Sequence, residues 1–251
     1  MSTFEATLDE VAVFRDSIAA VSEMIDETEL RAKETGIELV AADRAVVTVV
    51  DFFLHRNAFT SYQCDGEVTI GVNLVSLLQV LRRAVPGDVL SMKLEDNKLH
   101  VTLEGASTRR FTLPLIHVTR EETPDLAKLE AGFSATVSVD SEVLNAGIED
   151  AEMVADSTVF TLRKEQLHMK SEGDSSSAQL EIPQGESYKV LDANEPVRAR
   201  YSLDYLKKIF KARKLSDHAT LAMATDYPMK IQFEVPGKTR LSFILAPRVE
   251  E

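Results

Sequence analysis

The sequence repeats itself at a spacing of about 130 residues, and this repeat constrains the fold more than any other feature. Four matching pairs are separated by 129 residues and a fifth by 132. The pairs are Phe4 and Phe133, Leu74 and Leu203, Leu77 and Leu206, Asp88 and Asp217, and Phe111 and Phe243. Because the matches keep their order and nearly constant spacing, they predict two similar domains in the 251 residues.

Each half contains patterns for both helices and strands. Apolar residues at helical spacing predict a first helix in each half, with Phe14, Ile18, Val21 and Ile25 on one face in the first half and Leu144, Ile148 and Ala151 in the second. Leucine-rich segments predict a second helix in each half. The first begins at Leu74 and is ended by Pro86–Asp88, and the second covers residues 203–215 and is ended by Ser216 and Asp217. Alternating segments, such as Leu99, Val101 and Leu103 with polar residues between them, predict strands.

The two halves meet in a segment without a clear period. It is charged and contains Pro124, so we expect a long connecting loop there. The predicted organisation is an N-terminal domain over residues 1–117, a connecting loop over 118–131 and a C-terminal domain over 132–251.

The composition excludes several classes of protein. Twenty-eight basic and 41 acidic residues give a net charge of −13, which argues against a general coat for nucleic acid but allows a local basic surface. The single cysteine, Cys64, cannot form an internal disulfide or a cysteine-rich zinc site. The N-terminus lacks the pattern of a signal peptide and no segment is apolar enough to span a membrane, so we expect a soluble, intracellular protein.

Motifs of catalysis are missing from the sequence. The segment Gly66–Gly71 has phosphate-loop spacing, but Val72 and Asn73 stand where Lys and Ser or Thr are required, so it is interpreted as a turn entering a strand. The five histidines do not pair at metal-ligand spacing. Asp43 is interpreted as organising the turn before Val46. We therefore expect no enzyme activity, cofactor or metal.

Positive charge is concentrated on the second helix of each half. The segment from Leu203 to Leu215 carries five basic residues against a lone Asp204. Three of them, Lys207, Lys211 and Lys214, are spaced to share one stripe of a helix. In the equivalent helix of the first half, Arg82 and Arg83 are the only charged residues. A segregated basic surface in an acidic chain indicates contact with a phosphate backbone through charge alone.

Several of these segments resemble those of DNA sliding clamps of the proliferating cell nuclear antigen type, with most likeness to archaeal ones. The motifs that carry the resemblance are Gly36–Asp43, Tyr62–Asp65, Ile70–Leu74, Tyr201–Leu206 and the terminal Leu241–Glu251. The resemblance covers essentially the whole chain.

The resemblance implies an α+β fold with two similar clamp domains per chain. Three chains would close head to tail into a ring of pseudo-sixfold symmetry, with helices lining the hole and antiparallel sheets outside. Sheet edges at residues 109–117 of one chain and about 178–183 of the next would pair between subunits. The implied interface residues are Arg109, Arg110, Leu113, Leu115, Leu180 and Ile182.

The resemblance also implies the two functional surfaces and the partners. The DNA-facing residues would be Arg15, Arg82, Arg83, Lys207, Lys208, Lys211, Arg213 and Lys214. A pocket for a short partner peptide with one aliphatic and two aromatic anchors would be formed by Ala42, Val46, Val118, Leu126, Pro228, Ile244, Ala246, Pro247 and Arg248. Implied partners are double-stranded DNA without sequence preference, a DNA polymerase, a clamp loader, a flap endonuclease and a DNA ligase. The chain would be a homotrimer without a membrane partner, in the cytoplasm or nucleoid of an archaeon or in a eukaryotic nucleus.

Two alternatives remain open at the level of the sequence. The chain could be one subunit of a heterotrimeric or checkpoint-type clamp. It could also be a small-molecule enzyme built from a duplicated domain, although no motif supports that reading. One helix departs from the expected lining: the first helix of the second half carries Asp140, Glu142, Glu149 and Asp150 and no basic residue.

Overall fold

A computed structural model describes residues 3–118, 123–193 and 196–249 of the chain. The sequence repeat corresponds to a repeat of elements, with nine strands and two α-helices following one another in the same order in each copy. The first repeat comprises β1 (Phe4–Leu8), α1 (Val11–Val21), β2 (Glu27–Lys33), β3 (Gly36–Ala42), β4 (Thr48–His55), the 3₁₀-helix η1 (Arg56–Ala58), β5 (Ser61–Cys64), β6 (Val68–Asn73), α2 (Leu74–Leu81), β7 (Val89–Glu95), β8 (Lys98–Glu104) and β9 (Thr108–Pro114).

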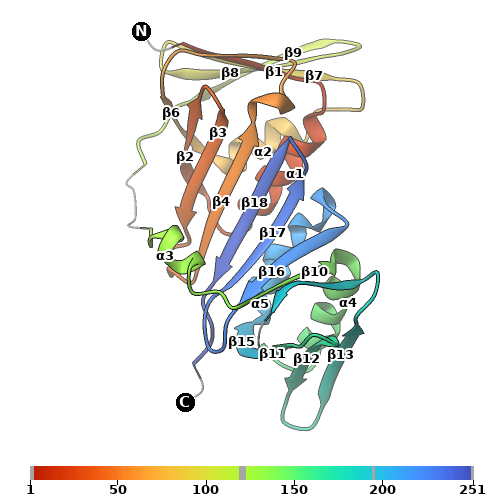
Figure 1. The fold of residues 1–251 in the computed structure, drawn as a ribbon. Helices are drawn as coiled ribbons and strands as arrows, with labels where there is room; N and C mark the ends of the chain where they lie inside the picture. The colour runs from red at the N-terminus through yellow and green to blue at the C-terminus, as the bar shows by residue number, and fades with distance from the viewer. Residues whose placement is uncertain (1–2, 119–122, 194–195, 250–251) are drawn as a thin grey trace. The chain divides into compact units, whose positions relative to one another are not determined.

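The second repeat follows a short helix, α3 (Leu126–Glu130), as Figure 1 shows. It comprises β10 (Ala135–Asp140), α4 (Ser141–Glu152), β11 (Ser157–Leu162), β12 (Gln166–Glu172), β13 (Ser177–Pro183), β14 (Tyr188–Ala193), β15 (Val197–Ser202), α5 (Leu203–Ile209), the 3₁₀-helix η2 (Phe210–Leu215), β16 (His218–Met223), β17 (Met229–Val235) and β18 (Thr239–Leu245).

The strands of the two repeats also pair in the same order. In the first repeat the orders are β5-β1-β7-β8-β9 and β6-β2-β3-β4. In the second repeat they are β14-β10-β16-β17-β18 and β15-β11-β12-β13. The α+β architecture of two similar copies is therefore confirmed.

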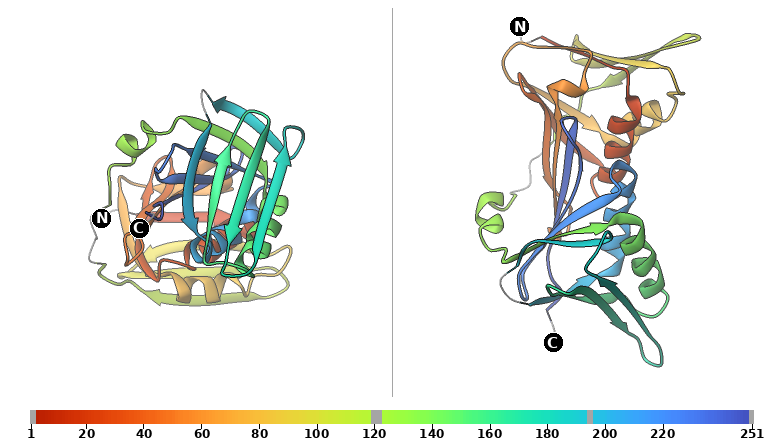
Figure 2. Two further views of the ribbon diagram at one scale, coloured as in Figure 1. Left: turned by 90° about the horizontal axis from the view of Figure 1, so that it is seen from below. Right: turned by 45° about the vertical axis from the view of Figure 1, so that its right-hand side comes forward.

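The helices of each repeat pack beside one another against the strands. α1 lies against α2, and α4 lies against α5 and against strands β10 to β13 (Figure 2). The repeated leucines Leu74, Leu77, Leu203 and Leu206 are each no more than 1% exposed, which shows why the sequence repeat is strongest there. Gly147 on α4 makes room for Leu180 of β13, because a Cβ at that glycine would lie 2.4 Å from the leucine Cδ2.

Two compact units result, and they do not coincide fully with the repeats. Described residues of Met1–Ala41, Val50–Glu121 and Glu234–Leu241 form unit 1, and those of Ala42–Val49, Glu122–Phe233 and Ser242–Glu251 form unit 2. The predicted boundaries at residues 117 and 132 stay a prediction. Within the described ranges, no helix is both long and apolar enough to cross a lipid bilayer.

Three expectations from the sequence are wrong in detail. The predicted helix over 203–215 is α-helical only to Ile209 and continues as the 3₁₀-helix η2, so Lys207, Lys211 and Lys214 do not share a continuous α-helical stripe. The connecting segment is not only a loop, because it contains α3, whose first turn is capped by the Asp125 side chain accepting from Lys128 N at 3.2 Å. Helix α1 ends at Val21, so Ile25 is buried outside the helix.

Candidate functional sites

Most of the predicted DNA-facing cations of unit 2 are paired with acidic residues of the same unit. Lys207 Nζ lies 2.8 Å from Glu152 Oε1 of α4, and this contact raises the pKa of the Lys207 ammonium. Arg213 lies 3.1 Å from Glu142 of α4, and Lys208 lies 2.7 Å from Asp204 one turn earlier. The acidic helix α4 thus neutralises part of the positive charge of α5 and η2. Lys211 and Lys214 are exposed and form no ion pair with any described residue.

The predicted DNA-facing arginines of unit 1 are on or next to its two helices. Arg15 of α1 pairs with its neighbour Asp16 at 2.9 Å. Arg82 and Arg83 are exposed immediately after α2, which ends at Leu81, and not within the helix as the sequence predicted. The carbonyl of Arg83 accepts a hydrogen bond from Arg109 of β9 at 2.6 Å, and Arg109 also pairs with the buried carboxylate of Asp88. Arg109 therefore fixes the segment that carries Arg83 to the edge strand β9.

Asp43 organises the turn that carries Val46, as the sequence predicts. Its Oδ1 accepts from Val47 N at 2.8 Å and from Thr48 N at 2.7 Å. Its Oδ2 accepts from the Tyr205 hydroxyl of α5 at 2.8 Å, within the same unit. Burial and this hydrogen bond raise the pKa of Tyr205 to about 12, so the hydroxyl keeps its proton and donates at neutral pH.

Val46 has an unusual conformation and exposure. It adopts a φ of 53° and is 55% exposed, although a β-branched residue is disfavoured in the left-handed region. The turn that Asp43 organises therefore exposes the apolar side chain of Val46 to solvent and holds its backbone in a strained conformation. Strain of this kind is found at sites that serve a function.

Three predicted pocket residues near the C-terminus lie beside this turn in unit 2. Thr48 Oγ1 donates to the carbonyl of Ile244 at 3.2 Å, and Ala246 N donates to the carbonyl of Val47 at 2.9 Å. Ile244 is only 5% exposed, whereas Ala246 and Pro247 are half-buried. The structure thus brings Val46, Ile244 and Ala246 into one neighbourhood.

Helix α3 is held against the turn that precedes Pro228. The Tyr227 hydroxyl donates to the carbonyl of Leu129 at 3.2 Å, and Lys230 lies 2.5 Å from Glu130. Leu126 is half-buried at the start of the helix. Ala42 is half-buried at the end of β3 in the same unit, whereas Val118 belongs to unit 1.

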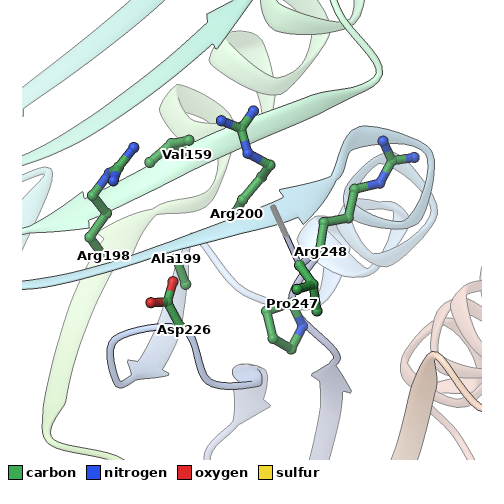
Figure 3. Close-up of a pocket in the computed structure, with 8 residues that line it drawn as sticks. Val159, Arg198, Ala199, Arg200, Asp226, Pro247 and Arg248 are labelled. Atoms are coloured by element: carbon green, nitrogen blue, oxygen red, sulfur yellow. The ribbon is translucent and has the colours of Figure 1, made fainter. Parts of the chain in front are cut away.

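Pro247 and Arg248 also line a cavity of about 370 Å³ in unit 2 (Figure 3). Its other lining residues are Val159, Arg198, Ala199, Arg200, Asp226 and Val249. Arg198 and Arg200 are not among the site residues predicted from the sequence. Their alternation with apolar residues on β15 is a signal for two cations on one strand face, and the structure leaves Arg198 exposed and Arg200 half-buried.

The predicted subunit edges are edge strands. β9 is the last strand of its sheet in the first repeat, and β13 is the last strand of its sheet in the second. Leu113 is half-buried on β9 and Leu180 is half-buried on β13, whereas Ile182 is only 3% exposed. Arg110 is exposed on β9, and Leu115 lies just past the end of that strand.

No group of three or more His, Cys, Asp or Glu side chains among the described residues is placed to hold a metal ion.

Comparison with known families identifies both halves of the chain. The model of the proliferating cell nuclear antigen N-terminal domain matches residues 3–118, and that of the C-terminal domain matches residues 129–248. The chain belongs to the proliferating cell nuclear antigen (PCNA) family. The two matched ranges correspond to the two structural repeats, and most of α3 lies between them.

Individual PCNA-family proteins are similar over the full length of the chain. The DNA polymerase sliding clamp of Pyrococcus horikoshii is 34% identical over 252 residues, which is 99% of each protein. DNA polymerase sliding clamp 1 of Thermococcus kodakarensis is 33% identical over 250 residues, again 99% of each. The crystal structure of PCNA from Entamoeba histolytica has a TM-score of 0.90 at 22% identity, covering 99% of this chain and all of that one, and it supports the same fold.

Proposed function

We propose that this protein is a DNA sliding clamp that encircles duplex DNA as a homotrimeric ring and acts as a polymerase processivity factor. The observation that carries the proposal is the duplicated architecture in a PCNA-family chain whose full-length relatives are named sliding clamps. The PCNA clamp family is not enzymatic. Its action is topological, since a closed ring stays on DNA without a strong contact. A clamp of this kind works inside the cell, on the DNA.

Strand equivalence supports the ring. β18 and β4 are hydrogen-bonded neighbours within the chain: Ala246 N donates to Val47 O in unit 2, and His55 N donates to Lys238 O at 2.8 Å in unit 1. The repeat equivalents of these two strands are β9 and β13, and each ends its sheet. A second copy of the chain would pair β9 with β13 as β18 pairs with β4. This pairing is heterologous, and two repeats in each of three chains give six units, which closes a ring.

The subunit edges would use the residues that the family resemblance implies, namely Arg109, Arg110, Leu113, Leu115, Leu180 and Ile182. A homotrimer is favoured over a heterotrimeric or checkpoint-type subunit, because β9 and β13 of identical chains can pair with each other and the full-length relatives are named DNA polymerase sliding clamps.

The helices would line the hole and meet the DNA backbone through few cations. With Lys207, Lys208 and Arg213 paired to acidic residues, the strongest contributors in unit 2 would be Lys211 and Lys214. Arg82 and Arg83 would contribute from unit 1, and Arg15 more weakly because Asp16 holds it. Weak contacts of this kind attract the duplex and leave sliding fast.

The neighbourhood of Val46 and Ile244 would capture a short partner peptide with one aliphatic and two aromatic anchors. An exposed apolar side chain held in a strained turn, next to Ala246 and Pro247, offers a surface on which aromatic anchors can be buried. DNA polymerase, clamp loader, flap endonuclease and DNA ligase would be tethered there. Tethering raises their local concentration at the DNA, so modest affinity for the pocket is sufficient.

The test of the topological function compares circular and linear DNA. A labelled clamp is placed by a clamp loader on nicked circular DNA, and the DNA is then cut once. We expect retention on the circle and release from the linear molecule on cutting, with retention restored when both ends are blocked. Equal retention on circular and cut DNA, or failure to be retained on the circle, would contradict the proposal.

Reversing the two unpaired cations of η2 tests the DNA-facing surface. The double variant Lys211→Glu with Lys214→Glu removes two phosphate contacts per subunit without breaking an ion pair with a described residue. The dependence of clamp–DNA affinity on salt, measured as the slope of log K against log salt, is expected to become shallower by about two for each engaged subunit. Clamp-stimulated DNA synthesis at moderate salt is expected to fall with it.

A matched control for that experiment changes the net charge equally at exposed lysines outside the helices. Lys164→Glu with Lys189→Glu serves this purpose. Both double variants should retain the trimeric mass. An unchanged salt slope in the Lys211 and Lys214 variant, or an equal change in the control, would refute the assignment.

A further inference from the structure

A cavity of unit 2 outside the predicted DNA-facing residues is lined by three arginines, Arg198, Arg200 and Arg248. Figure 3 shows Arg198 and Arg200 on the same side of β15, with Val159 of β11 between them and Arg248 beyond on the C-terminal segment. Of the lining residues, only Asp226 is acidic. The chain has a net charge of −13, so the gathering of three guanidinium groups around one cavity indicates a site for negative charge.

The local structure fixes the arginines at this cavity. Alternation along β15 buries Val197, Ala199 and Tyr201 and leaves Arg198 and Arg200 on the opposite face. In the strand register, Arg200 stands opposite Val159 and Arg198 opposite Thr161. The C-terminal segment is attached to this strand, because Arg248 N donates to the carbonyl of Arg200 at 2.8 Å. That single hydrogen bond brings the third guanidinium to the other two.

The positive charge of the cavity already acts on nearby carboxylates. Arg248 lies 2.7 Å from Asp156, and its hydrogen bond is the main reason why the pKa of Asp156 lies below its usual value. Lys170 is the main cause of the lowered pKa of Glu172, and Arg200 adds to it. Asp156 is 79% exposed, so another carboxylate can replace it at Arg248 with little loss.

The cavity shares two lining residues with the predicted peptide pocket. Pro247 and Arg248 belong to both, and Ala246, one residue earlier, is bonded to the turn that carries Val46. A peptide whose anchors occupy the pocket therefore has a flank next to the arginines. Val159, Pro247 and Val249 supply apolar contacts for the chain of such a flank.

We propose that this cavity is a subsite for an acidic segment, rich in Glu or Asp, next to the apolar anchors of a partner peptide. The inference rests on the proposed function, because the anchors place the acidic segment. Each of the three arginines would exchange a contact within the chain for a carboxylate of the peptide, and at Arg248 the contact given up is the ion pair with Asp156. The subsite would select among partners by charge, whereas the apolar pocket captures all of them.

The experiment measures the affinity of labelled peptides for the intact protein. All peptides share the same anchors. Each carries three Glu, three Gln or three Lys, either before or after the anchors. On the side of the anchors that reaches the cavity, the Glu peptide is expected to bind about fivefold more tightly than the Gln peptide at low salt, and the Lys peptide more weakly than both. The preference should shrink at high salt, because the groups are partly exposed.

Variants assign the preference to the cavity. Arg198→Gln with Arg200→Gln should remove most of the preference for Glu, since only Arg248 remains, and should leave binding of the Gln peptide unchanged. Lys164→Gln with Lys189→Gln changes the net charge equally at exposed sites and should leave the preference intact. Asp156→Asn removes the competing carboxylate at Arg248 and should increase the preference.

The outcomes separate the inference from the proposed function. Equal binding of the Glu and Gln peptides, with the anchors still required, would overturn the acidic subsite and leave the clamp function standing. Loss of the preference in the Lys164 and Lys189 control would also overturn it, since the effect would then be one of net charge. Failure of every peptide to bind would contradict the peptide pocket itself. If inorganic phosphate at millimolar concentration abolishes the preference without weakening the Gln peptide, the cavity binds anions but is not selective for the peptide, and the inference fails.

Discussion

The variants Leu113→Asp and Leu180→Asp are each expected to convert the trimer to a monomer. Leu113 lies on the edge strand β9 and Leu180 on the edge strand β13, and both are half-buried in the single chain. Closing the ring would bury them further between subunits. A carboxylate buried there without a partner costs about 3 kcal/mol for each interface, and every 1.4 kcal/mol is tenfold in affinity. Light scattering should report the 27.8 kDa chain in place of a species of three times that mass.

A mixture of the two variants distinguishes lost pairing from lost folding. Because the proposed interface is heterologous, each variant keeps one intact edge. Mixing them should restore one good interface and give a species of twice 27.8 kDa that cannot close into a ring. Clamp-dependent synthesis should be lost in each variant and in the mixture. A misfolded variant would give no dimer, and a variant that remains trimeric would show that these edges do not form the interface.

Much of the fold can be predicted from the sequence because the repeated residues are buried in the core. The leucines of α2 and α5 recur at a spacing of 129 residues because each repeat must fill the same space between helices and sheet. Asp43 is another case in which local chemistry suffices, since an acidic residue before a turn accepts from the backbone N–H groups that follow it. The helix α3 carries a signal too, in Asp125 as its N-cap after Pro124, but its five residues are too few to show a period.

The charges at the candidate sites could not be predicted in the same way. The pair of Lys207 and Glu152 joins residues 55 positions apart, and only the packing of α4 against α5 brings them together. The change from α-helix to 3₁₀-helix at Phe210 has no distinct residue signal, and it reorients Lys211 and Lys214. The cavity of three arginines likewise depends on one backbone hydrogen bond, from Arg248 to Arg200, between two distant segments. Sequence patterns specify which residues are exposed, whereas contacts across the chain decide what they meet.

The variant Val46→Asp is expected to abolish capture of the partner peptide while making the protein more stable. Val46 is 55% exposed at a φ of 53°. A β-branched residue is disfavoured in this conformation, and Asp or Asn tolerates it, so the substitution should raise the free energy of unfolding by about 1 kcal/mol. For a chain of this length that corresponds to about 2–4 °C in Tm. A substitution that stabilises the fold and removes binding cannot act through unfolding.

The loss of binding follows from what the Asp side chain would face. An aromatic anchor seated over residue 46 would have to bury a carboxylate without a partner, and about 3 kcal/mol, or about 100-fold in affinity, would be lost. Val46→Asn carries no charge and should lose less. Ile244→Asp is a weaker test, because Ile244 is only 5% exposed and its replacement endangers the fold.

Leu191→Asp supplies the matched control for Val46→Asp. It introduces the same charge at a residue that is 60% exposed on β14, a strand that contributes no residue to the predicted pocket, and it should leave peptide affinity unchanged. Peptide titration and thermal unfolding of Val46→Asp, Val46→Asn and Leu191→Asp measure the two effects. Normal capture by Val46→Asp would remove Val46 from the pocket. A fall in the Tm of Val46→Asp would mean that Val46 stabilises the turn held by Asp43. The exposure of Val46 would then not be a feature that destabilises the fold and serves binding.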